Sequence, residues 1–359
     1  MVVSEITQNH LHLTEFGHTL RNKFFNLKTP HNLAELLESS ELDLNYYLHE
    51  LESSQTYRTF VIPKRSGGKR KISAPIPELK ILQQKLNQIL QTVYDPMPSV
   101  HGFVWDRNVV TNSEPHAGKR YILNLDIKDF FPSIHFGRVR GLFMAKPYQL
   151  PAKVATMIAE LCCYGNQLPQ GAPTSPTVSN MICAKMDIQF QKLAKSCQST
   201  YTRYADDLTF STTRTKFPTN LAKIQQEESQ QRVKLGQAIL DILNQNGFAV
   251  NPNKVRLQSN DEHQEVTGLT SNEFPNVRRT LIREVRAMLH AWRKYGLENA
   301  EQHYQQKHSD RGRIKPTGSH QFQLALRGKI NFIGMVRGED DEIYQKYLHQ
   351  YEELLNEES

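Results

Sequence analysis

The stretch YTRYADDLTFS, residues 201–211, places two adjacent aspartates between two short runs of β-forming residues. Aromatic and β-branched residues on both sides of a polar turn are typical of a β-hairpin. The stretch therefore predicts a hairpin with Asp206 and Asp207 at its tip. Neighbouring carboxylates repel each other unless a cation neutralises them, although aspartates are also common in ordinary turns.

A second stretch adds a third acid. Residues 121–127, YILNLDI, are rich in β-formers and predict a buried strand with Asp126 at its end. If this strand and the hairpin pair in one sheet, the three carboxylates meet. Carboxylate oxygens are ligands that Mg²⁺ prefers, and Mg²⁺ keeps positions open for water and substrate phosphates. A pair of such ions would activate a 3′-hydroxyl and stabilise a departing pyrophosphate.

The rest of the chain alternates helical and β-type patterns, which favours an α+β fold. The expected elements, in chain order, are helices up to about Thr56, a glycine-turn hairpin with a basic tip over 58–75, a helix from Pro77, helices over 135–144 and 152–161, a helix after the loop 168–180 capped by Thr174 or Ser175, a long polar helix over 223–246, strands over 248–257 and 263–269, and a basic helical remainder.

Composition sets further bounds. The 359 residues are 38% hydrophobic and 23% charged, which predicts a globular protein with a sizeable core. No stretch approaches the ~20 apolar residues of a membrane span, and the N-terminus lacks a secretory signal. We therefore expect a cytoplasmic protein with no membrane partner. The four cysteines lack zinc-site spacing, so reduced thiols are expected instead.

Positive charge is concentrated near the C-terminus. The net charge is +7, and residues 278–329 alone carry 12 Lys or Arg against 4 Asp or Glu. Such a segment predicts either a polyanion-binding face or a solvated helical surface. Trp292 and Tyr295 interleave with basic residues, so they could stack on unpaired RNA bases. Trp292 could equally be a core residue.

Three motifs together resemble reverse transcriptases. YADD, residues 204–207, resembles their YxDD box, LNLDIKDFFPSI, residues 123–134, resembles their first aspartate motif, and LPQGAPTSP, residues 168–176, resembles the motif that follows. Their order and spacing fit as well. The resemblance covers about residues 58–269 and implies a right-hand polymerase fold with fingers, palm and thumb.

The resemblance also implies a domain layout. We expect an N-terminal helical cap over 1–56 and fingers over 57–120. A palm follows over 121–270, with finger-derived helices inserted around 135–170, and a basic helical thumb over 271–359. No maturase, endonuclease or RNase H domain fits in the remaining chain, which argues against a group II intron protein.

Site roles follow from the same resemblance. Asp126, Asp206 and Asp207 match the catalytic acids that hold two Mg²⁺ ions, with the Ile127 carbonyl beside the metals. The residues expected to contact the incoming dNTP or its template are Lys69, Arg70, Phe131, Gln170, Gly171 and Lys254. Phe131 would exclude a 2′-hydroxyl, or else be a core residue beside Phe130. The basic pair could also be a solvated hairpin tip. Lys254 matches a lysine that would protonate the leaving pyrophosphate, and Arg256 is close by.

Two further elements resemble the retron branch. TNSEPH, residues 111–116, resembles the retron NAxxH element, with Ser113 where alanine is usual, and VTG, residues 266–268, resembles a retron signature. The RNA-binding candidates are Asn112, His116, Val266, Thr267, Gly268, Arg278, Arg279, Arg283 and Arg286. The resemblance implies a cognate structured noncoding RNA (msr-msd), priming from a guanosine 2′-hydroxyl to give msDNA, and antiphage defence with an accessory effector.

Two alternatives remain at this point. One is a reverse transcriptase of another bacterial branch, of the diversity-generating or Abi type. The other is a non-catalytic RNA-binding scaffold with a polymerase-like fold. A scaffold has no need for clustered, mutually repelling carboxylates, so an intact set of three aspartates speaks against it.

Overall fold

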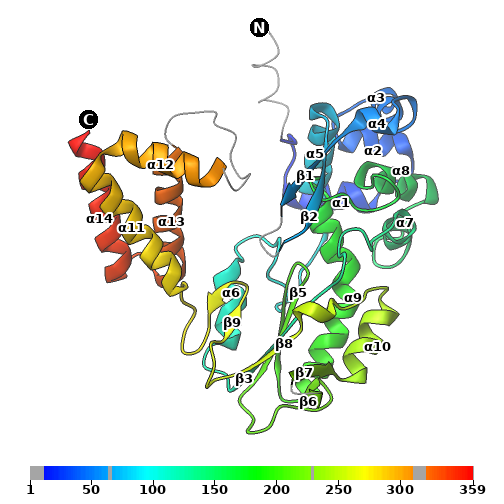
Figure 1. Ribbon diagram of the computed structural model, residues 1–359. Helices are drawn as coiled ribbons and strands as arrows, with labels where there is room; N and C mark the ends of the chain where they lie inside the picture. Colours follow the sequence, from blue (N-terminus) through cyan, green and yellow to red (C-terminus); the bar gives the residue numbers. More distant parts are fainter. Residues whose placement is uncertain (1–11, 64–66, 228–229, 310–320, 359) are drawn as a thin grey trace. The chain divides into compact units, whose positions relative to one another are not determined.

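The computed structural model describes residues 12–63, 67–227, 230–309 and 321–358 (Figure 1). The chain forms two compact units. The first unit comprises Met1–Asn108, Leu123–Phe210 and Arg214–Leu257, and the second comprises Val109–Ile122, Ser211–Thr213 and Gln258–Ser359. Part of the expected hairpin tip (64–66) and part of the basic C-terminal segment (310–320) lie outside the described residues.

A four-stranded sheet carries both aspartate motifs. Its strand order is β4-β5-β3-β8, with bounds β3 (Tyr121–Asp126), β4 (Thr200–Tyr204), β5 (Asp207–Thr212) and β8 (Arg256–Ser259). The strand expected to end at Asp126 is therefore confirmed, and so is the hairpin around Asp206 and Asp207. Because β5 lies beside β3, the hairpin tip and the end of β3 are brought together.

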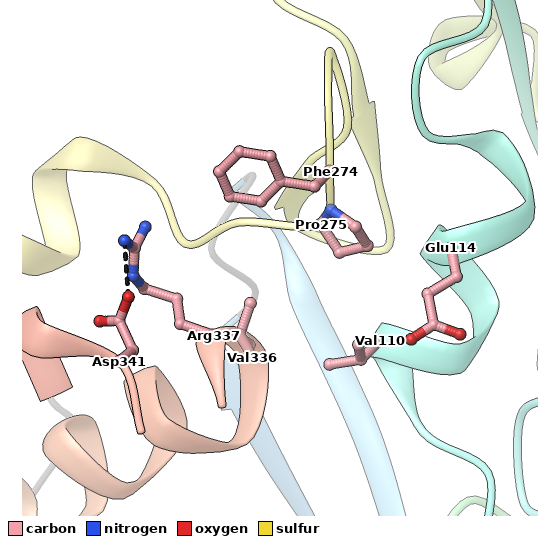
Figure 2. Close-up of a pocket in the computed structure, with 7 residues that line it drawn as sticks. All are labelled: Val110, Glu114, Phe274, Pro275, Val336, Arg337 and Asp341. Carbon is pink, nitrogen blue, oxygen red and sulfur yellow. Dashed lines mark ion pairs between the residues drawn. The ribbon is translucent and has the colours of Figure 1, made fainter. Parts of the chain in front are cut away.

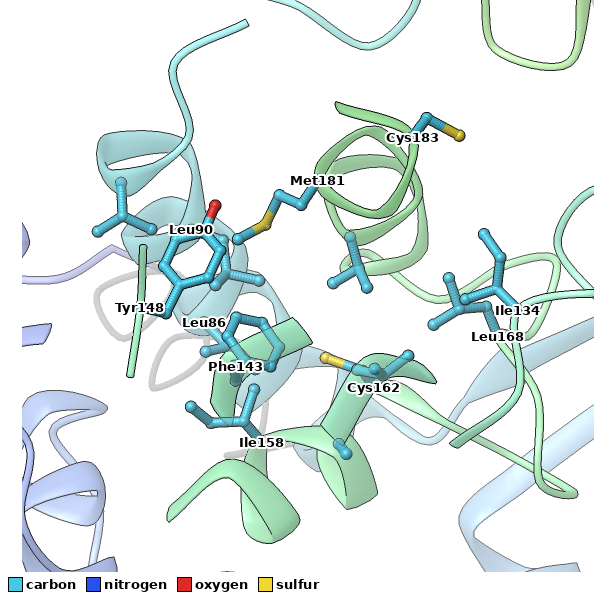
Figure 3. Packing of buried hydrophobic residues seen from close by; sticks show 14 of the residues in the cluster. Leu86, Leu90, Ile134, Phe143, Tyr148, Ile158, Cys162, Leu168, Met181 and Cys183 are labelled. Atoms are coloured by element: carbon cyan, nitrogen blue, oxygen red, sulfur yellow. The ribbon is translucent and has the colours of Figure 1, made fainter. Parts of the chain in front are cut away.

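Helices build the main core of the first unit. They are α5 (Pro77–Val93), α7 (Phe136–Met144), α8 (Ala152–Cys162), α9 (Ser175–Ser196) and α10 (Gln237–Gln245). The helix α9 packs against β4, and α10 packs against α9. Figure 3 shows side chains of α5, α7, α8 and α9 meeting in this core, among them Leu86, Phe143, Ile158 and Met181, all of which are buried.

The N-terminal segment is helical, as expected for its described residues. It contains α1 (Gly17–Phe25), α2 (Pro30–Leu36), α3 (Glu41–Asn45), the π-helical turn η1 (Tyr46–Glu50) and α4 (Ser53–Thr56). The expected glycine-turn hairpin follows as β1 (Tyr57–Pro63) and β2 (Lys69–Pro75), paired antiparallel. The leucines at helical spacing, Leu33 and Leu37, are fully buried.

The prediction of one long polar helix over 223–246 is wrong. The structure has a two-stranded hairpin instead, β6 (Ala222–Glu227) and β7 (Gln230–Leu235), and only then α10. Glutamine and glutamate favour helices only weakly, so strand pairing can override that preference. Gly236 marks the break, because a Cβ there would lie 1.9 Å from the carbonyl oxygen of Asn220.

Smaller expectations also need correction. Neither hydroxyl caps α9, since the N-cap Thr174 makes no side-chain cap hydrogen bond and Ser175 Oγ donates to the Pro169 carbonyl at 2.7 Å. The strand expected over 248–257 shrinks to a single bridge between Ile127 and Val250, the 3₁₀ turn η3 (Pro252–Lys254) and β8. Of the strand over 263–269, only β9 (Glu265–Val266) and β10 (Leu269–Thr270) form.

The second unit is a helical bundle with a small strand pair. It contains α6 (Val109–Ser113), the 3₁₀ turn η2 (Glu114–His116), β9, β10, α11 (Arg279–Tyr295), α12 (Leu297–Ser309), α13 (Gln321–Arg337) and α14 (Glu342–Glu357). A separate apolar cluster holds it together, centred on residues such as Val285, Leu326 and Ile330. Among the helices of the described residues, none has the length and hydrophobicity needed to cross a bilayer.

Candidate active site

Backbone hydrogen bonds hold the two aspartate motifs together. The amide of Ile127 donates to the Asp206 carbonyl at 3.0 Å, and the amide of Asn251 donates to the Asp126 carbonyl at 2.8 Å. Ala205 turns the hairpin in a left-handed conformation, with φ at 56°. Three carboxylates from β3 and the β4–β5 turn therefore share one neighbourhood.

These carboxylates destabilise one another's charge. Asp126 is 5% exposed. Burial raises the pKa of Asp206, and the negative charge of Asp126 raises it further. Burial together with the charges of Asp206 and Asp126 raises the pKa of Asp207 to about 7. Such a cluster is strained without a positive charge among its members.

Lys254 supplies that positive charge in the structure. Its ammonium group forms an ion pair with one carboxylate oxygen of Asp126. The side-chain amide of Asn251 donates to the other carboxylate oxygen at 3.3 Å. Burial would lower the pKa of Lys254, but the hydrogen bond and the charge of Asp126 outweigh that effect and raise it. The ammonium is therefore protonated at neutral pH.

The donor set fits a hard divalent cation. Among the described residues, no three His, Cys, Asp or Glu side chains are already arranged around one point as metal ligands. Lys254 and Asn251 occupy the oxygens of Asp126 that such an ion would use. Carboxylate oxygens nevertheless match the ligand preferences of Mg²⁺, and a cation would relieve their repulsion.

A fully buried ion pair stabilises the β4–β5 hairpin. The guanidinium of Arg203 and the carboxylate of Asp187 are both 0% exposed and form two hydrogen bonds, at 2.8 and 2.7 Å. Arg203 also donates to Asn180 at 2.9 Å and to the Ala205 carbonyl at 3.1 Å. Tyr201 donates to Asp187 at 2.8 Å. This network holds the turn that presents the aspartates, and no local motif singles it out.

The residues expected to contact the nucleotide lie on four segments of the first unit. Arg70 on β2 is exposed, and its charge lowers the pKa of Asp206 against the dominant effect of burial. The carbonyl of Gln170 accepts from the Ser73 amide at 2.8 Å. Gly171 lies so close to β2 that a Cβ would be 2.8 Å from the Ser73 oxygen. The 168–176 loop is thereby attached to the basic hairpin.

Phe131 is half-buried, and its ring centroid lies 5.2 Å from Phe130. On its other side it faces Phe103, with ring centroids 6.3 Å apart. Phe130 is buried and stacks on Phe248 at 5.8 Å. Phe131 is thus the partly accessible ring of this aromatic group, while Phe130 fills the core.

The two retron-like elements contact each other inside the second unit. The Asn112 amide donates to the Thr267 hydroxyl at 3.3 Å, and Ser113 bonds to Ser271 at 2.8 Å. His116 bonds to Ser211 at 2.7 Å. The side chains of Asn112, His116 and Val266 are buried, whereas Thr267 is half-buried and Gly268 is exposed. The elements therefore hold a loop whose tip faces solvent.

The basic residues of α11 are accessible. Arg279, Arg283 and Arg286 are exposed, and Arg278 forms an ion pair with Glu265 at 2.5 Å. Trp292 is 1% exposed and donates to Glu358 at 2.8 Å, so it is a core residue and cannot stack on RNA bases in this structure. Tyr295 is 55% exposed.

A cavity of about 310 Å³ lies in the second unit (Figure 2). Its lining includes Val110, Glu114, Phe274 and the ion pair between Arg337 and Asp341. None of the three catalytic candidates contributes to it.

The chain belongs to a known family. Residues 62–271 match the family model described as reverse transcriptase (RNA-dependent DNA polymerase). This match covers both aspartate motifs and the loop between them. The chain therefore belongs to the reverse transcriptase family and has its α+β fold.

Curated relatives specify the branch. The chain is 37% identical to the retron Mx65 reverse transcriptase of Myxococcus xanthus over 73% of its length and 34% identical to the retron Mx162 enzyme of that organism over 76%. It is 31% identical to the retron Ec86 reverse transcriptase of Escherichia coli, over 77% of this chain and 82% of the relative. The chain is therefore a retron-type reverse transcriptase.

The chain spans 62% and 60% of the two Myxococcus relatives. Among solved structures, a telomerase from Candida albicans in complex with an RNA fragment matches at 13% identity and a TM-score of 0.40, over 83% of this chain and 63% of that chain.

Proposed function

We propose that this chain copies RNA into DNA at a site where Asp126, Asp206 and Asp207 hold two Mg²⁺ ions. The observation that carries this proposal is the meeting of three mutually repelling carboxylates at the end of β3 and the β4–β5 turn. When bound, the ions supply Lewis-acid activation of the 3′-hydroxyl and charge neutralisation on the phosphates. The Ile127 carbonyl is a further candidate ligand.

The chain's own residues bind and orient the nucleotide. Arg70 and Lys69, both exposed on β2, offset charge on the incoming triphosphate. The accessible ring of Phe131 lies under the sugar and excludes a 2′-hydroxyl. Gln170 and Gly171 line the nucleotide and template from the loop attached to β2. Lys254 is protonated at neutral pH and would pass a proton to the leaving pyrophosphate.

We further infer a cognate structured RNA as the template and partner. The named relatives are retron reverse transcriptases, and the two retron-like elements join in one loop. Asn112, His116 and Val266 hold this loop from inside, and Thr267 and Gly268 contact RNA at its tip. Arg278, Arg279, Arg283 and Arg286 bind phosphates. Synthesis starts from a guanosine 2′-hydroxyl and yields msDNA, in a defence system with an accessory effector protein.

A primer-extension assay tests the polymerase proposal. Wild-type protein with an RNA template, a DNA primer, dNTPs and Mg²⁺ should extend the primer, and chelation should abolish extension. Asp206→Asn should reduce the rate by at least ~10³-fold, comparable to losing a catalytic group. The matched control is Asp129→Asn, which alters an exposed aspartate three residues beyond Asp126. Undiminished extension by Asp206→Asn would remove the basis of the proposal.

Nucleic acid that copurifies with the expressed protein, together with its gene neighbourhood, tests the retron function. Debranching of the purified material should convert one branched RNA–DNA species into separate RNA and DNA. Recovery of ordinary cellular RNA alone, with no branch, would contradict priming from a 2′-hydroxyl.

A further inference from the structure

The loop between α5 and α6 exposes two large aromatic side chains. Trp105 is 86% exposed, and Phe103 is 42% exposed. The chain has only two tryptophans, and the other, Trp292, is 1% exposed. Keeping an indole ring in water forgoes the stabilisation that burial would give. Exposed rings of this kind offer a flat apolar face on which a ligand can stack.

The start of this loop is fixed to the catalytic hairpin. The amide of His101 donates to the Arg203 carbonyl at 2.8 Å, and the amide of Arg203 donates to Ser99 at 2.8 Å. The Asn180 amide donates to the Gly102 carbonyl at 2.9 Å. A Cβ at Gly102 would lie 2.4 Å from the Ala205 nitrogen. The loop thus packs directly on the turn that carries Asp206 and Asp207.

The end of the loop is also constrained. The guanidinium of Arg107 anchors it by donating to the Met97 carbonyl at 2.6 Å and to the Val100 carbonyl. Phe103 and Asp106 adopt left-handed conformations, with φ at 60° and 58°. Residues other than glycine rarely adopt such φ angles unless the surrounding structure enforces them. The loop therefore presents its aromatic rings in a fixed arrangement.

Phe103 connects the loop that carries Trp105 with the proposed nucleotide site. Phe131, the accessible ring expected under the sugar, lies 6.3 Å from Phe103. Trp105 is two residues further along the chain, so its Cα lies within about 7–8 Å of the Phe103 Cα. Phe103 therefore packs beside Phe131 of the proposed nucleotide site, and Trp105 lies close to Phe103 along the loop.

We propose that Trp105 is a stacking platform for an unpaired base of the nucleic acid strand held at the catalytic hairpin. This inference rests on the proposed polymerase function and extends it by naming a contact for single-stranded nucleic acid. Every base has a π-face, so an aromatic ring can hold a strand without reading its sequence. The loop that carries Trp105 is fixed to the turn with Asp206 and Asp207, and its Phe103 packs beside Phe131.

A protein partner fits this loop less well than a base. Stable protein interfaces bury roughly 800 Å² on each partner, whereas this loop offers two rings among polar neighbours. Asp106 and Arg107 follow Trp105 directly. A flat ring with polar neighbours matches the size of a single nucleobase.

Intrinsic fluorescence tests the proposal directly. The probe is a short oligouridylate, added to full-length protein with a chelator so that no chemistry occurs. Binding should quench the emission, and Trp105→Phe should lose most of the quenching, because the remaining tryptophan is buried. Affinity, measured by anisotropy of a labelled oligomer, should fall about 5- to 100-fold in Trp105→Ala, the range expected for one stacked base.

Matched variants sharpen the outcome. Trp105→Phe keeps a ring and should weaken binding far less than Trp105→Ala. Leu42→Ala alters a residue of α3 that is 81% exposed and should leave the affinity unchanged. If Trp105→Ala binds the oligomer as tightly as wild type does, the proposal is overturned. This outcome includes the case in which Trp105 binds a protein partner. Equal losses in Trp105→Phe and Trp105→Ala would also overturn it.

Failure of this inference is separable from failure of the proposed function. Asp206→Asn should bind the oligomer as wild type does while losing extension, because the binding measurement needs no catalysis. If wild type extends primers and Trp105→Ala binds normally, only the stacking role is lost. If Asp206→Asn still extends primers, the polymerase site itself is misassigned.

Discussion

Two arginines illustrate how differently this chain uses positive charge. Arg203 in the first unit is fully buried, and its guanidinium bonds to Asp187, Asn180 and the Ala205 carbonyl. Arg283 on α11 of the second unit is exposed and has no ion pair among the described residues. The first charge is satisfied inside the protein and stabilises the turn that carries Asp206 and Asp207. The second is available to an external polyanion.

The largest expected effect comes from breaking the internal pair. Arg203→Met should destabilise the protein by about 3–5 kcal/mol, because Asp187 would be left as an uncompensated buried charge. Chemical denaturation followed by circular dichroism measures the loss. The double variant Arg203→Met/Asp187→Leu should recover much of it, since an apolar pair of similar volume is tolerated. A cost below ~1 kcal/mol for the single variant would contradict this account of the turn.

The next effect concerns the contact between the α5–α6 loop, at Gly102, and the β4–β5 turn, at Ala205. Gly102→Ala should cost about 1–3 kcal/mol and slow primer extension, because the new methyl group would push against the Ala205 backbone. The matched control is Gly141→Ala on α7, where an added Cβ meets nothing within 4 Å. That variant should instead gain up to about 1 kcal/mol from helix propensity. Equal stabilities of the two variants would show that the turn tolerates displacement.

Sequence reasoning identifies the carboxylates but not their support. Asp126, Asp206 and Asp207 are recognisable because each belongs to a short local motif with β-formers around it. Arg203 lies inside one of those motifs, yet its partners Asp187 and Asn180 come from α9, and a tertiary contact of that kind leaves no local periodicity. Trp105 gives no sequence signal for a similar reason, since a single aromatic in a loop carries no pattern until its exposure is known.

Errors in the predicted fold arise where local preference and tertiary pairing disagree. Residues 222–235 are rich in glutamine, which favours a helix, but they pair as β6 and β7. Ala222 and Leu221 are buried there, and the close approach of Gly236 to Asn220 separates the hairpin from α10. The strong apolar periodicity of α5 leaves no such conflict, so its sequence predicts that helix correctly.

A smaller effect should appear in the catalytic cluster itself. Asp207→Asn should stabilise the metal-free protein by about 1 kcal/mol at pH 8, because it removes the repulsion, and solvent around the exposed Asp207 keeps the gain this small. The folded-state pKa of Asp207 is raised to about 7, above its ordinary value of 3.8. The wild-type carboxylate therefore costs stability above pH 7, and that cost vanishes as the pH falls below 3.8.

Melting temperatures of both proteins in chelator, measured from about pH 4 to pH 8, check the prediction for Asp207. The difference between variant and wild type should grow with rising pH. A difference that is constant or shrinks across this range would mean that the carboxylate is not under repulsion from Asp206 and Asp126.

The smallest effect tests the external charge. Arg283→Gln should weaken RNA binding a few-fold and reduce the slope of log affinity against log salt by about one, as expected for the loss of one phosphate contact. Lys346→Gln on α14 is the matched control, because it removes an exposed positive charge from another helix of the same unit. If both variants change the salt slope equally, general charge attracts the RNA and α11 is not a defined phosphate-binding face. If only Arg283→Gln changes the salt slope, the exposed arginine binds a phosphate of an external strand, whereas Arg203 binds partners inside the protein.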